Sequence, residues 1–470
     1  MARSRMSNRS ADTKAKRLLW GFIGQMLERI RRHLTDPESQ HRQIALGFFW
    51  VSLFVFVGKL AGAAKEMTIA WRYGVSATVD AYVFVFNLVS WPVAVWFSIL
   101  TVVLLPLVAR LRKDAPEALP RFRAELLGLT LIFGLMLGLL FSLGLPILLS
   151  KGWLGLSGPA LTAALSMVNG LALLAPLGTL ISLFSAWMLA AGHHRNTLFE
   201  AIPAFSLLVA LLMPPAWLPE PLLWGSVAGF ALHAAALGVP FIRRGELPLP
   251  RVTQRSPAWR FFWASIGIMA LGQTLSSATN LVDQIFAAGL DEGSLSALSY
   301  ANRILSLILG LGATAVGRAT LPVFSKEVAK GSGHAVTALA LHWFKWMFML
   351  GLVVMTVSWL LAPFMVRVLF ERGAFTPLDT DTVSSLLRYA LFQVVFYFPS
   401  IVLVAALASQ GRHKWIALSG ALNLLFKLPV SFIFVRKFGI DGLVLSNVLV
   451  YALSAALLLA FVRRPLSVSD

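Results

Sequence analysis

Cysteine is absent from the 470 residues, and charged side chains are scarce. Without cysteine there is no disulfide, no thiol nucleophile and no cysteine-ligated metal or iron–sulfur site. Charged residues make up 13% of the chain and hydrophobic residues 58%, against about 25% and about 45–50% in soluble domains. A chain with so little polar surface needs lipid around it, so the class of soluble enzymes is excluded.

Long apolar runs fill most of the sequence. A membrane-spanning helix needs about 20 mostly apolar residues, and a helix satisfies its own backbone hydrogen bonds inside lipid. We therefore expect an all-α polytopic membrane protein with about twelve transmembrane helices, with kinks at Pro92, Pro176, Pro399 and Pro429. The runs lie at about 44–73, 79–111, 122–150, 159–191, 197–214, 221–241, 257–289, 294–325, 337–366, 378–410, 414–435 and 442–462.

The formal net charge of +19 indicates membrane topology rather than nucleic-acid binding. Most Lys and Arg residues lie in the N-terminal segment and in the loops after the even-numbered helices. Because basic loops stay in the cytoplasm, we expect a multi-pass protein of the bacterial inner membrane with both termini cytoplasmic. The expected regions are a basic tail (1–43), a six-helix lobe (44–241), a linker (242–256), a second lobe (257–463) and a short tail (464–470).

A weak internal repeat supports the two lobes. Leu105-Pro106 followed by a basic loop resembles Leu321-Pro322 followed by another, and Gly192-His193-His194-Arg195 resembles Gly411-Arg412-His413-Lys414. Six expected helices separate the partners, so both halves share one orientation. Parallel repeats of this kind surround a central cavity in transporters, which predicts a cavity between two six-helix lobes.

Nine ionisable residues fall where lipid would otherwise be, among them Asp283 and Lys427, and five others are candidates for a substrate cavity. These five are Lys59, Lys65, Glu66, Asp80 and Arg303. Ionisable residues within membrane helices usually face a cavity or a partner. One interpretation is a basic cavity in which the three cations bind phosphate oxygens of an anionic substrate, while the two acids position them. The other is a set of internal salt bridges that hold helices together without a ligand.

No signature of catalysis emerges. The chain has no GxxxxGK[ST] phosphate loop, so nothing indicates ATP-driven transport. His193 and His194 have no plausible acidic or histidine partner nearby. We expect no catalytic residue, no metal and no cofactor, and therefore not an enzyme.

Three stretches resemble the MurJ/MviN family of lipid II flippases, within the multidrug/oligosaccharidyl-lipid/polysaccharide exporter superfamily. The first runs from Gly58-Lys59-Leu60 through Lys65-Glu66 to Val79-Asp80-Ala81-Tyr82. The second runs from Val282-Asp283-Gln284 through Gly293-Ser294 and Tyr300-Ala301-Asn302-Arg303 to Leu321-Pro322. The third is Leu369-Phe370-Glu371-Arg372-Gly373-Ala374-Phe375-Thr376.

The resemblance implies alternating access by two lobes that export a glycan linked to undecaprenyl pyrophosphate. The cavity arginines of the family fall on Lys59, Lys65 and Arg303, and its acidic partners fall on Glu66 and Asp80. Lysine keeps the charge but lacks the planar fork of arginine. The family's basic pair in helix 2 is absent here, and the chain ends after helix 12, where typical members add two helices.

The resemblance also points to a polar group on helices 7 and 11. In the family, the position of Asp283 and a polar pair at Asn423 and Lys427 contribute to a cation site. Asn423 and Lys427 are four residues apart, so they share a helix face. We expect an Asp283–Lys427 ion pair that replaces a bound sodium ion. The alternative is that Lys427 reaches outward and Asp283 bonds elsewhere.

From these departures we expect a flippase for a lipid-linked glycan of exopolysaccharide, capsule or O-antigen assembly. The alternatives are a lipid II flippase for peptidoglycan synthesis, a cation-coupled multidrug exporter and a membrane glycosyltransferase. An exporter of cations would need an acidic or aromatic cavity, and a transferase a sizeable catalytic loop. The expected partners are the polyprenyl-pyrophosphate-linked glycan and membrane lipid, without nucleic acid, for a monomer that associates with polysaccharide-assembly proteins.

Overall fold

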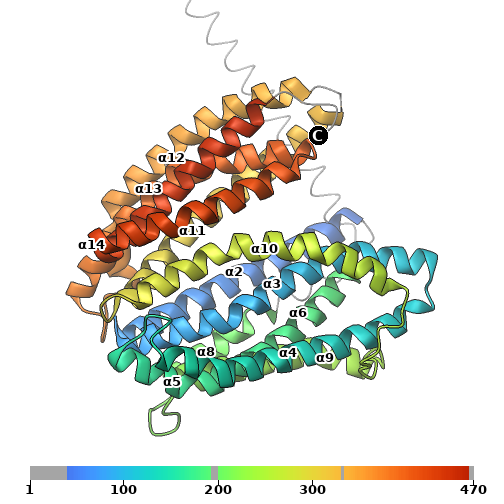
Figure 1. Ribbon diagram of the computed structural model, residues 1–470, viewed down its shortest axis with the longest axis horizontal. Coiled ribbons are helices and arrows are strands. Elements are labelled where there is room, and N and C mark those ends of the chain that lie inside the picture. Colours follow the sequence, from blue (N-terminus) through green and yellow to red (C-terminus); the bar gives the residue numbers. More distant parts are fainter. Residues whose placement is uncertain (1–39, 192–198, 330–332, 465–470) are drawn as a thin grey trace, which may run out of the picture. The chain divides into compact units, whose positions relative to one another are not determined.

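The computed structural model describes residues 40–191, 199–329 and 333–464, which form helices joined by turns (Figure 1). By its contacts the chain divides into two units, Met1–Leu60 and Ala61–Asp470, with the boundary inside the first helix. The expected basic tail lies outside the described residues up to residue 39. The helices are α2 (Gln40–Tyr73), α3 (Ala77–Asp114), α4 (Ala118–Ser150), α5 (Gly158–Ala172), α6 (Leu174–Ala190), α8 (Ile202–Leu212), α9 (Pro221–Arg243), α10 (Ala258–Ala288), α11 (Ser294–Ala329), α12 (Gly333–Phe370), α13 (Pro377–Ser409) and α14 (His413–Arg463).

These helices follow the apolar runs of the sequence. Seven described helices are long and apolar enough to cross a membrane, and eight if α5 and α6 count as one broken span. The two meet at a bend of 41°, just before Pro176, where proline lacks the N–H of a continuous helix. Helix α8 is shorter than its expected range of 197–214, because it begins at Ile202 and ends at Leu212, shortly before Pro214 and Pro215.

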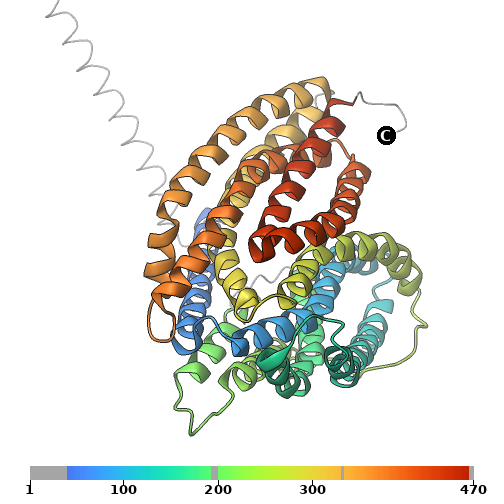
Figure 2. The same cartoon turned by 60° about the vertical axis from the view of Figure 1, so that its left-hand side comes forward.

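Helix α14 is a hairpin. Its 51 residues are interrupted at Gly439, which has φ 57° and ψ −134°, a conformation that only glycine adopts without strain. The hydroxyls of Ser431 and Ser446 lie 2.9 Å apart across the turn, so the two arms run side by side (Figure 2). The arms correspond to the two expected helices, 414–435 and 442–462.

Within the larger unit, α3 and α13 are the central helices. Helix α3 packs against α5, α6 and α10, and α13 packs against α11, α12 and α14. Helix α10 contacts both α3 and α14, so it joins the first half of the chain to the second. The fold is the expected all-α bundle of membrane helices.

The buried apolar residues form three clusters. The largest draws on both halves of the chain, and it includes Ile69, Phe84, Tyr300 and Phe375. The second is confined to the first half and the start of α10. The third is confined to α11–α14. The two halves therefore share one core at the end where α2 meets α3 and α10 meets α11.

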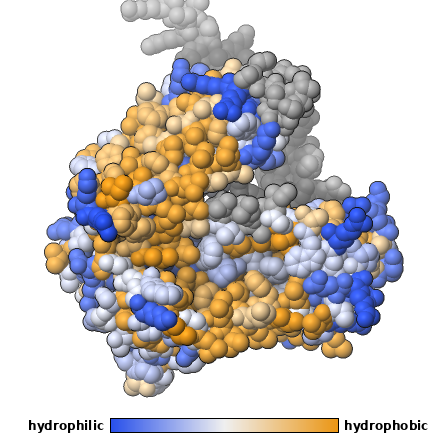
Figure 3. Space-filling model, viewed as in Figure 1, coloured by the Kyte–Doolittle hydropathy of each residue, from blue (hydrophilic) through white to orange (hydrophobic). Residues whose placement is uncertain are grey.

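The outer surface is apolar where lipid would contact it. On α4, the side chains of Leu135, Met136, Leu139, Leu140 and Leu143 are all about 60% exposed, and their spacing follows one helical face. Apolar side chains cover much of the visible surface, whereas hydrophilic ones gather toward its ends (Figure 3). This pattern is the one expected of a chain that spans a membrane.

A buried carboxylate fixes the segment between α9 and α10. Glu125 of α4 accepts hydrogen bonds from the Trp259 indole (2.7 Å), the Thr253 hydroxyl (2.8 Å) and the backbone N–H groups of Arg255 (3.1 Å) and Ser256 (3.0 Å). Four donors from this segment and the start of α10, together with Arg121 of α4 at 3.2 Å, make the carboxylate a strong anchor. The segment falls at the expected linker, 242–256, but it is held against α4.

Candidate functional site

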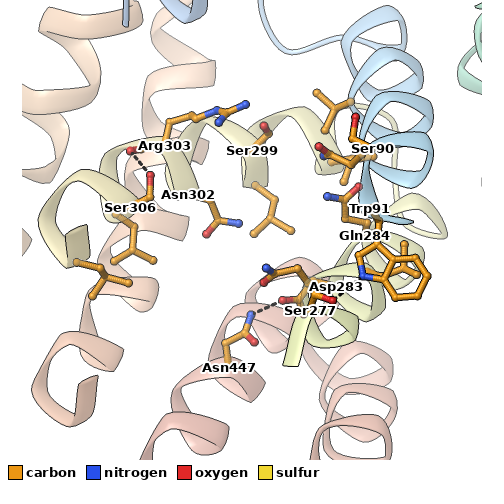
Figure 4. A pocket seen from close by; sticks show the side chains of 18 of the residues that line it. Ser90, Trp91, Ser277, Asp283, Gln284, Ser299, Asn302, Arg303, Ser306 and Asn447 are labelled. Atoms are coloured by element: carbon orange, nitrogen blue, oxygen red, sulfur yellow. Dashed lines mark hydrogen bonds between the residues drawn. The ribbon is translucent and has the colours of Figure 1, made fainter. Parts of the chain in front are cut away.

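A polar cavity of about 540 Å³ opens inside the larger unit. Helices α3, α10, α11, α13 and α14 line it. In Figure 4, Asn302 points toward Asp283 and Asn447, while Arg303, on the same helix, extends along the upper side of the view. Among its described lining residues, two are charged, Arg303 and Asp283. The remaining polar lining consists of amides, hydroxyls and one indole, from Asn87, Ser90, Trp91, Ser277, Asn280, Gln284, Ser299, Asn302, Ser306, Gln393, Asn447 and Tyr451.

Arg303 belongs to a charged cluster beside this cavity. Its Nη2 lies 3.0 Å from Glu66 Oε1, and the Lys65 Nζ lies 2.8 Å from the same oxygen. The Glu66 and Lys65 side chains are 13% and 19% exposed, whereas that of Arg303 is 52% exposed. Two cations on one carboxylate leave a net charge of about +1. The exposed guanidinium retains donors for an anionic group, because arginine has five N–H donors.

Two of the expected site residues, Lys59 and Asp80, are not part of this charged cluster as described. Lys59 belongs to the smaller unit, Met1–Leu60, so its expected part in the cavity stays a prediction. Asp80 is 3% exposed, and its carboxylate accepts hydrogen bonds from the backbone N–H groups of Gly293 and Ser296, both at 2.6 Å. The expected contact of Asp80 with the cations is thus replaced by a contact with backbone at the start of α11.

The starts of α3 and α11 cap each other. Asp80 of α3 accepts from the first turn of α11, and Glu292, just before α11, accepts from the backbone N–H of Ala77 at 3.3 Å. Tyr300 adds a bond of 3.0 Å from its hydroxyl to the Gly74 carbonyl. Helix N-termini carry unpaired N–H groups and a partial positive charge. Each acid therefore stabilises the helix opposite and ties the two halves together.

The turn between α12 and α13 closes the same region. Ala374 donates its backbone N–H to the Trp71 carbonyl at 2.8 Å. At the start of α13, the Thr380 hydroxyl donates a hydrogen bond to the Glu371 carboxylate at 2.7 Å. This hydrogen bond and the nearby Arg367 guanidinium lower the pKa of the Glu371 carboxyl below its usual value. This turn lies in the stretch 369–376, which resembles the family, and it packs against the end of α2.

Asp283 and Lys427 are in contact. The Lys427 Nζ lies 2.5 Å from Asp283 Oδ1, and the lysine side chain is fully buried. Asn447, on the second arm of α14, donates from Nδ2 to Asp283 Oδ2 at 2.9 Å and accepts from the Lys427 ammonium. Asn423 lies one turn from Lys427 with its buried Oδ1 unpaired in the described part of the chain. The Lys427 ammonium therefore lies directly beside the Asp283 carboxylate, while its replacement of a sodium ion stays a prediction.

Sequence reasoning missed several residues of this region. Asn447 completes the charged pair, and the Trp91 indole donates to Ser277 Oγ at 2.9 Å across α3 and α10. Polar side chains inside apolar runs are the signal that would have found them, since Ser446-Asn447 interrupts a stretch of Leu and Val. Across the described residues, no group of His, Asp or Glu is placed to hold a metal ion.

Comparison with known proteins places this fold. A solved structure described as lipid II flippase MurJ in an inward closed conformation superposes with a TM-score of 0.75 at 19% identity, covering 88% of each chain. An inward-facing multidrug resistance MATE transporter of the MOP superfamily gives 0.72 at 16% identity, covering 86% of this chain and 94% of the other. The chain is thus a multi-pass helical membrane protein that shares its fold with these two structures.

The family follows from the sequence comparison. The family profile described as lipid II flippase MurJ matches residues 69–470, and the chain belongs to this family. A protein of Bdellovibrio bacteriovorus named probable lipid II flippase MurJ is 28% identical over 270 residues, 57% of this chain. The match spans about half of that relative, 52% of its length. The family confirms the expected multi-pass protein of the inner membrane, related to flippases.

Proposed function

We propose that this protein moves lipid II across the inner membrane by alternating access between its two lobes. The observation that carries the proposal is the half-exposed Arg303 guanidinium beside a cavity lined by amides and hydroxyls. Arginine suits a pyrophosphate because its planar fork matches phosphate oxygens. Amides and hydroxyls suit the hydroxyl and amide groups of a sugar headgroup, because they both donate and accept hydrogen bonds.

The electrostatics favour an anionic substrate over a cationic drug. Asp283 is the lining carboxylate in the described cavity, and Lys427 and Asn447 already engage it. Glu66 is likewise engaged by Lys65 and Arg303. Little negative charge is left to attract a cation. The likeness to multidrug transporters therefore supports the fold and not their substrates.

A lipid-linked glycan other than lipid II is the second candidate. It is favoured by the two lysines, Lys59 and Lys65, at positions where the family pattern has arginine. Both candidates share the pyrophosphate carrier, and they differ in the headgroup that the amide-lined cavity would hold.

One depletion experiment separates the two. A strain lacking its own lipid II flippase carries this chain under a repressible promoter, and polyprenyl-linked intermediates are quantified by mass spectrometry. We expect growth while the chain is expressed and accumulation of lipid II when it is repressed. Failure to sustain growth at normal protein levels, with another lipid-linked glycan accumulating in the native host, would reject lipid II in favour of the second candidate.

A further inference from the structure

A buried arginine with two unpaired donor atoms, among the residues that the structure describes, follows the end of α13. Arg412 lies between α13 and α14 and is 1% exposed. Its Nη1 reaches the Arg464 carbonyl at 3.5 Å, while Nε and Nη2 have no hydrogen-bond partner among the residues that the structure describes. Buried polar groups almost always have a partner, and an unpaired buried charge is costly. These N–H groups therefore call for an acceptor.

More donors and cations surround the same place. The Trp415 indole N–H is also buried without an acceptor in the described part of the chain. The Arg412 guanidinium lies 6.0 Å from the centre of the Trp415 ring, that of Arg464 4.6 Å from it, and the Lys414 ammonium 5.8 Å from it. The Arg412 and Arg464 guanidiniums both lie near this ring, and an anion between them would offset the repulsion between their charges. The cluster consists of Arg412, Lys414, Trp415 and Arg464.

The start of α14 adds to the attraction. Arg412 is the residue before its first turn, and no side chain caps that turn. The unpaired N–H groups and the dipole at a helix N-terminus favour an anion. The apolar side of the cluster is closed by Phe461, whose ring centre lies 5.6 Å from the Arg464 guanidinium and 4.8 Å from the Trp415 ring.

From these contacts we infer that Arg412, Trp415 and Arg464 form an oxyanion site that binds a phosphate group. Unpaired N–H donors need an acceptor, two guanidiniums need negative charge, and phosphate provides several strong acceptor oxygens that match the planar fork of arginine. None of these residues lines the polar cavity. The site therefore does not depend on the proposed transport function.

Two sources carry such a phosphate. One is the headgroup of an anionic phospholipid, because tryptophan and arginine gather at the membrane surface and this end of α14 is the one expected to be cytoplasmic. The other is a soluble phosphate. Phosphatidylglycerol and inorganic phosphate are the probes that distinguish them.

The test uses the full chain in detergent, with bound molecules counted by native mass spectrometry. Phosphatidylglycerol, phosphatidylcholine and inorganic phosphate are titrated separately, and phosphate is then added as a competitor of the lipid. We expect phosphatidylglycerol to bind in preference to phosphatidylcholine. Arg412→Gln should weaken that binding roughly tenfold or more, the usual effect of losing a charged hydrogen bond.

Two further variants keep the test decisive if Arg412→Gln fails to fold. Trp415→Phe replaces the indole by a smaller aromatic ring and removes the N–H, so it should weaken binding about fivefold. Arg464→Gln should weaken it as well. The matched control is Arg463→Gln, an exposed neighbour, which should leave binding unchanged. Binding of inorganic phosphate alone, sensitive to the same variants, would assign the site to a soluble phosphate. Binding of neither probe, or binding that these variants leave intact, would overturn the inference.

Discussion

At the scale of single residues, the buried charge of Lys427 is explained by its partners. Lys427 is fully buried, yet Asp283 and Asn447 surround its ammonium. Taking a charge out of water costs several kcal/mol, so each partner of such a pair depends on the other. Arg303 is different, because half of its side chain remains exposed and available to a ligand.

Removing one member of the buried pair should destabilise the protein. Lys427→Met leaves Asp283 charged and unpaired, and we expect a loss of about 3–5 kcal/mol in the free energy of unfolding. Chemical denaturation in detergent measures it. Lys437→Met, a change of an exposed lysine on the same helix, is the matched control.

The double variant makes the test specific. In Lys427→Met with Asp283→Asn no charge is left unpaired, so stability should return toward that of the native protein. Additive losses in the double variant would show that the two residues do not act as a pair.

Arg303 should matter for transport rather than for folding. Arg303→Ala removes a half-exposed guanidinium, so we expect normal protein levels and loss of lipid II transport in the depletion strain. Arg303→Lys should retain part of the activity, because it keeps the charge without the fork. Arg260→Ala, which removes an exposed arginine at the start of α10, is the control. Full activity of Arg303→Ala would rule out its binding role.

At the scale of elements, glycine and capping acids decide how the helices begin and turn. Gly439 turns α14 back on itself, and Asp80 and Glu292 cap α11 and α3 across the two halves. Neither feature depends on hydrophobic burial. The glycine turn and the capping acids both act on backbone groups, and the spacing of apolar residues in the sequence does not predict them.

Gly439→Ala should weaken the hairpin. A Cβ would meet nothing within 4 Å, so the cost comes from the backbone conformation alone, about 1–3 kcal/mol. Gly267→Ala is the comparison, because its Cβ is also unobstructed and its backbone is helical. Chemical denaturation should show a loss for the first variant and none for the second; equal effects would refute the backbone explanation.

Asp80→Asn should loosen the contact between the two halves. An amide accepts hydrogen bonds less strongly than a carboxylate and lacks the charge that favours the start of α11. Since the chain has no cysteine, spin labels introduced by Thr78→Cys and Ser294→Cys report the separation of α3 and α11. We expect longer distances to become populated in Asp80→Asn, whereas an unchanged distribution would contradict the role of the caps.

At the scale of the whole molecule, the sequence predicted the helices far better than their contacts. Apolar runs place every described helix to within a few residues, including both arms of α14, because lipid demands long apolar segments. The family resemblance brought Lys65, Glu66 and Arg303 together, but it misplaced Asp80. The cavity amides escaped notice, since a lone Asn or Gln is meaningful only once helices distant in sequence are adjacent.

Coupling to sodium should be absent. The ammonium of Lys427 occupies the position next to Asp283, so replacing sodium by choline should leave transport by the native protein unchanged. In Lys427→Asn the carboxylate is freed, and sodium should then increase transport or thermal stability. Sodium-dependent transport by the native protein would refute this replacement.

The Asp283–Lys427 contact also constrains the order in which the chain is made. Lys427 enters the membrane 144 residues after Asp283 and 20 residues before Asn447. During synthesis, α10 is inserted in the bilayer before the first arm of α14. The Asp283 carboxylate is therefore present to pair with Lys427, whose charge would be unfavourable in lipid alone. If α10 were delayed or misoriented, Lys427 would be unpaired and the first arm of α14 would not be stable in the membrane. Assembly would then stop at an intermediate that quality-control proteases can recognise.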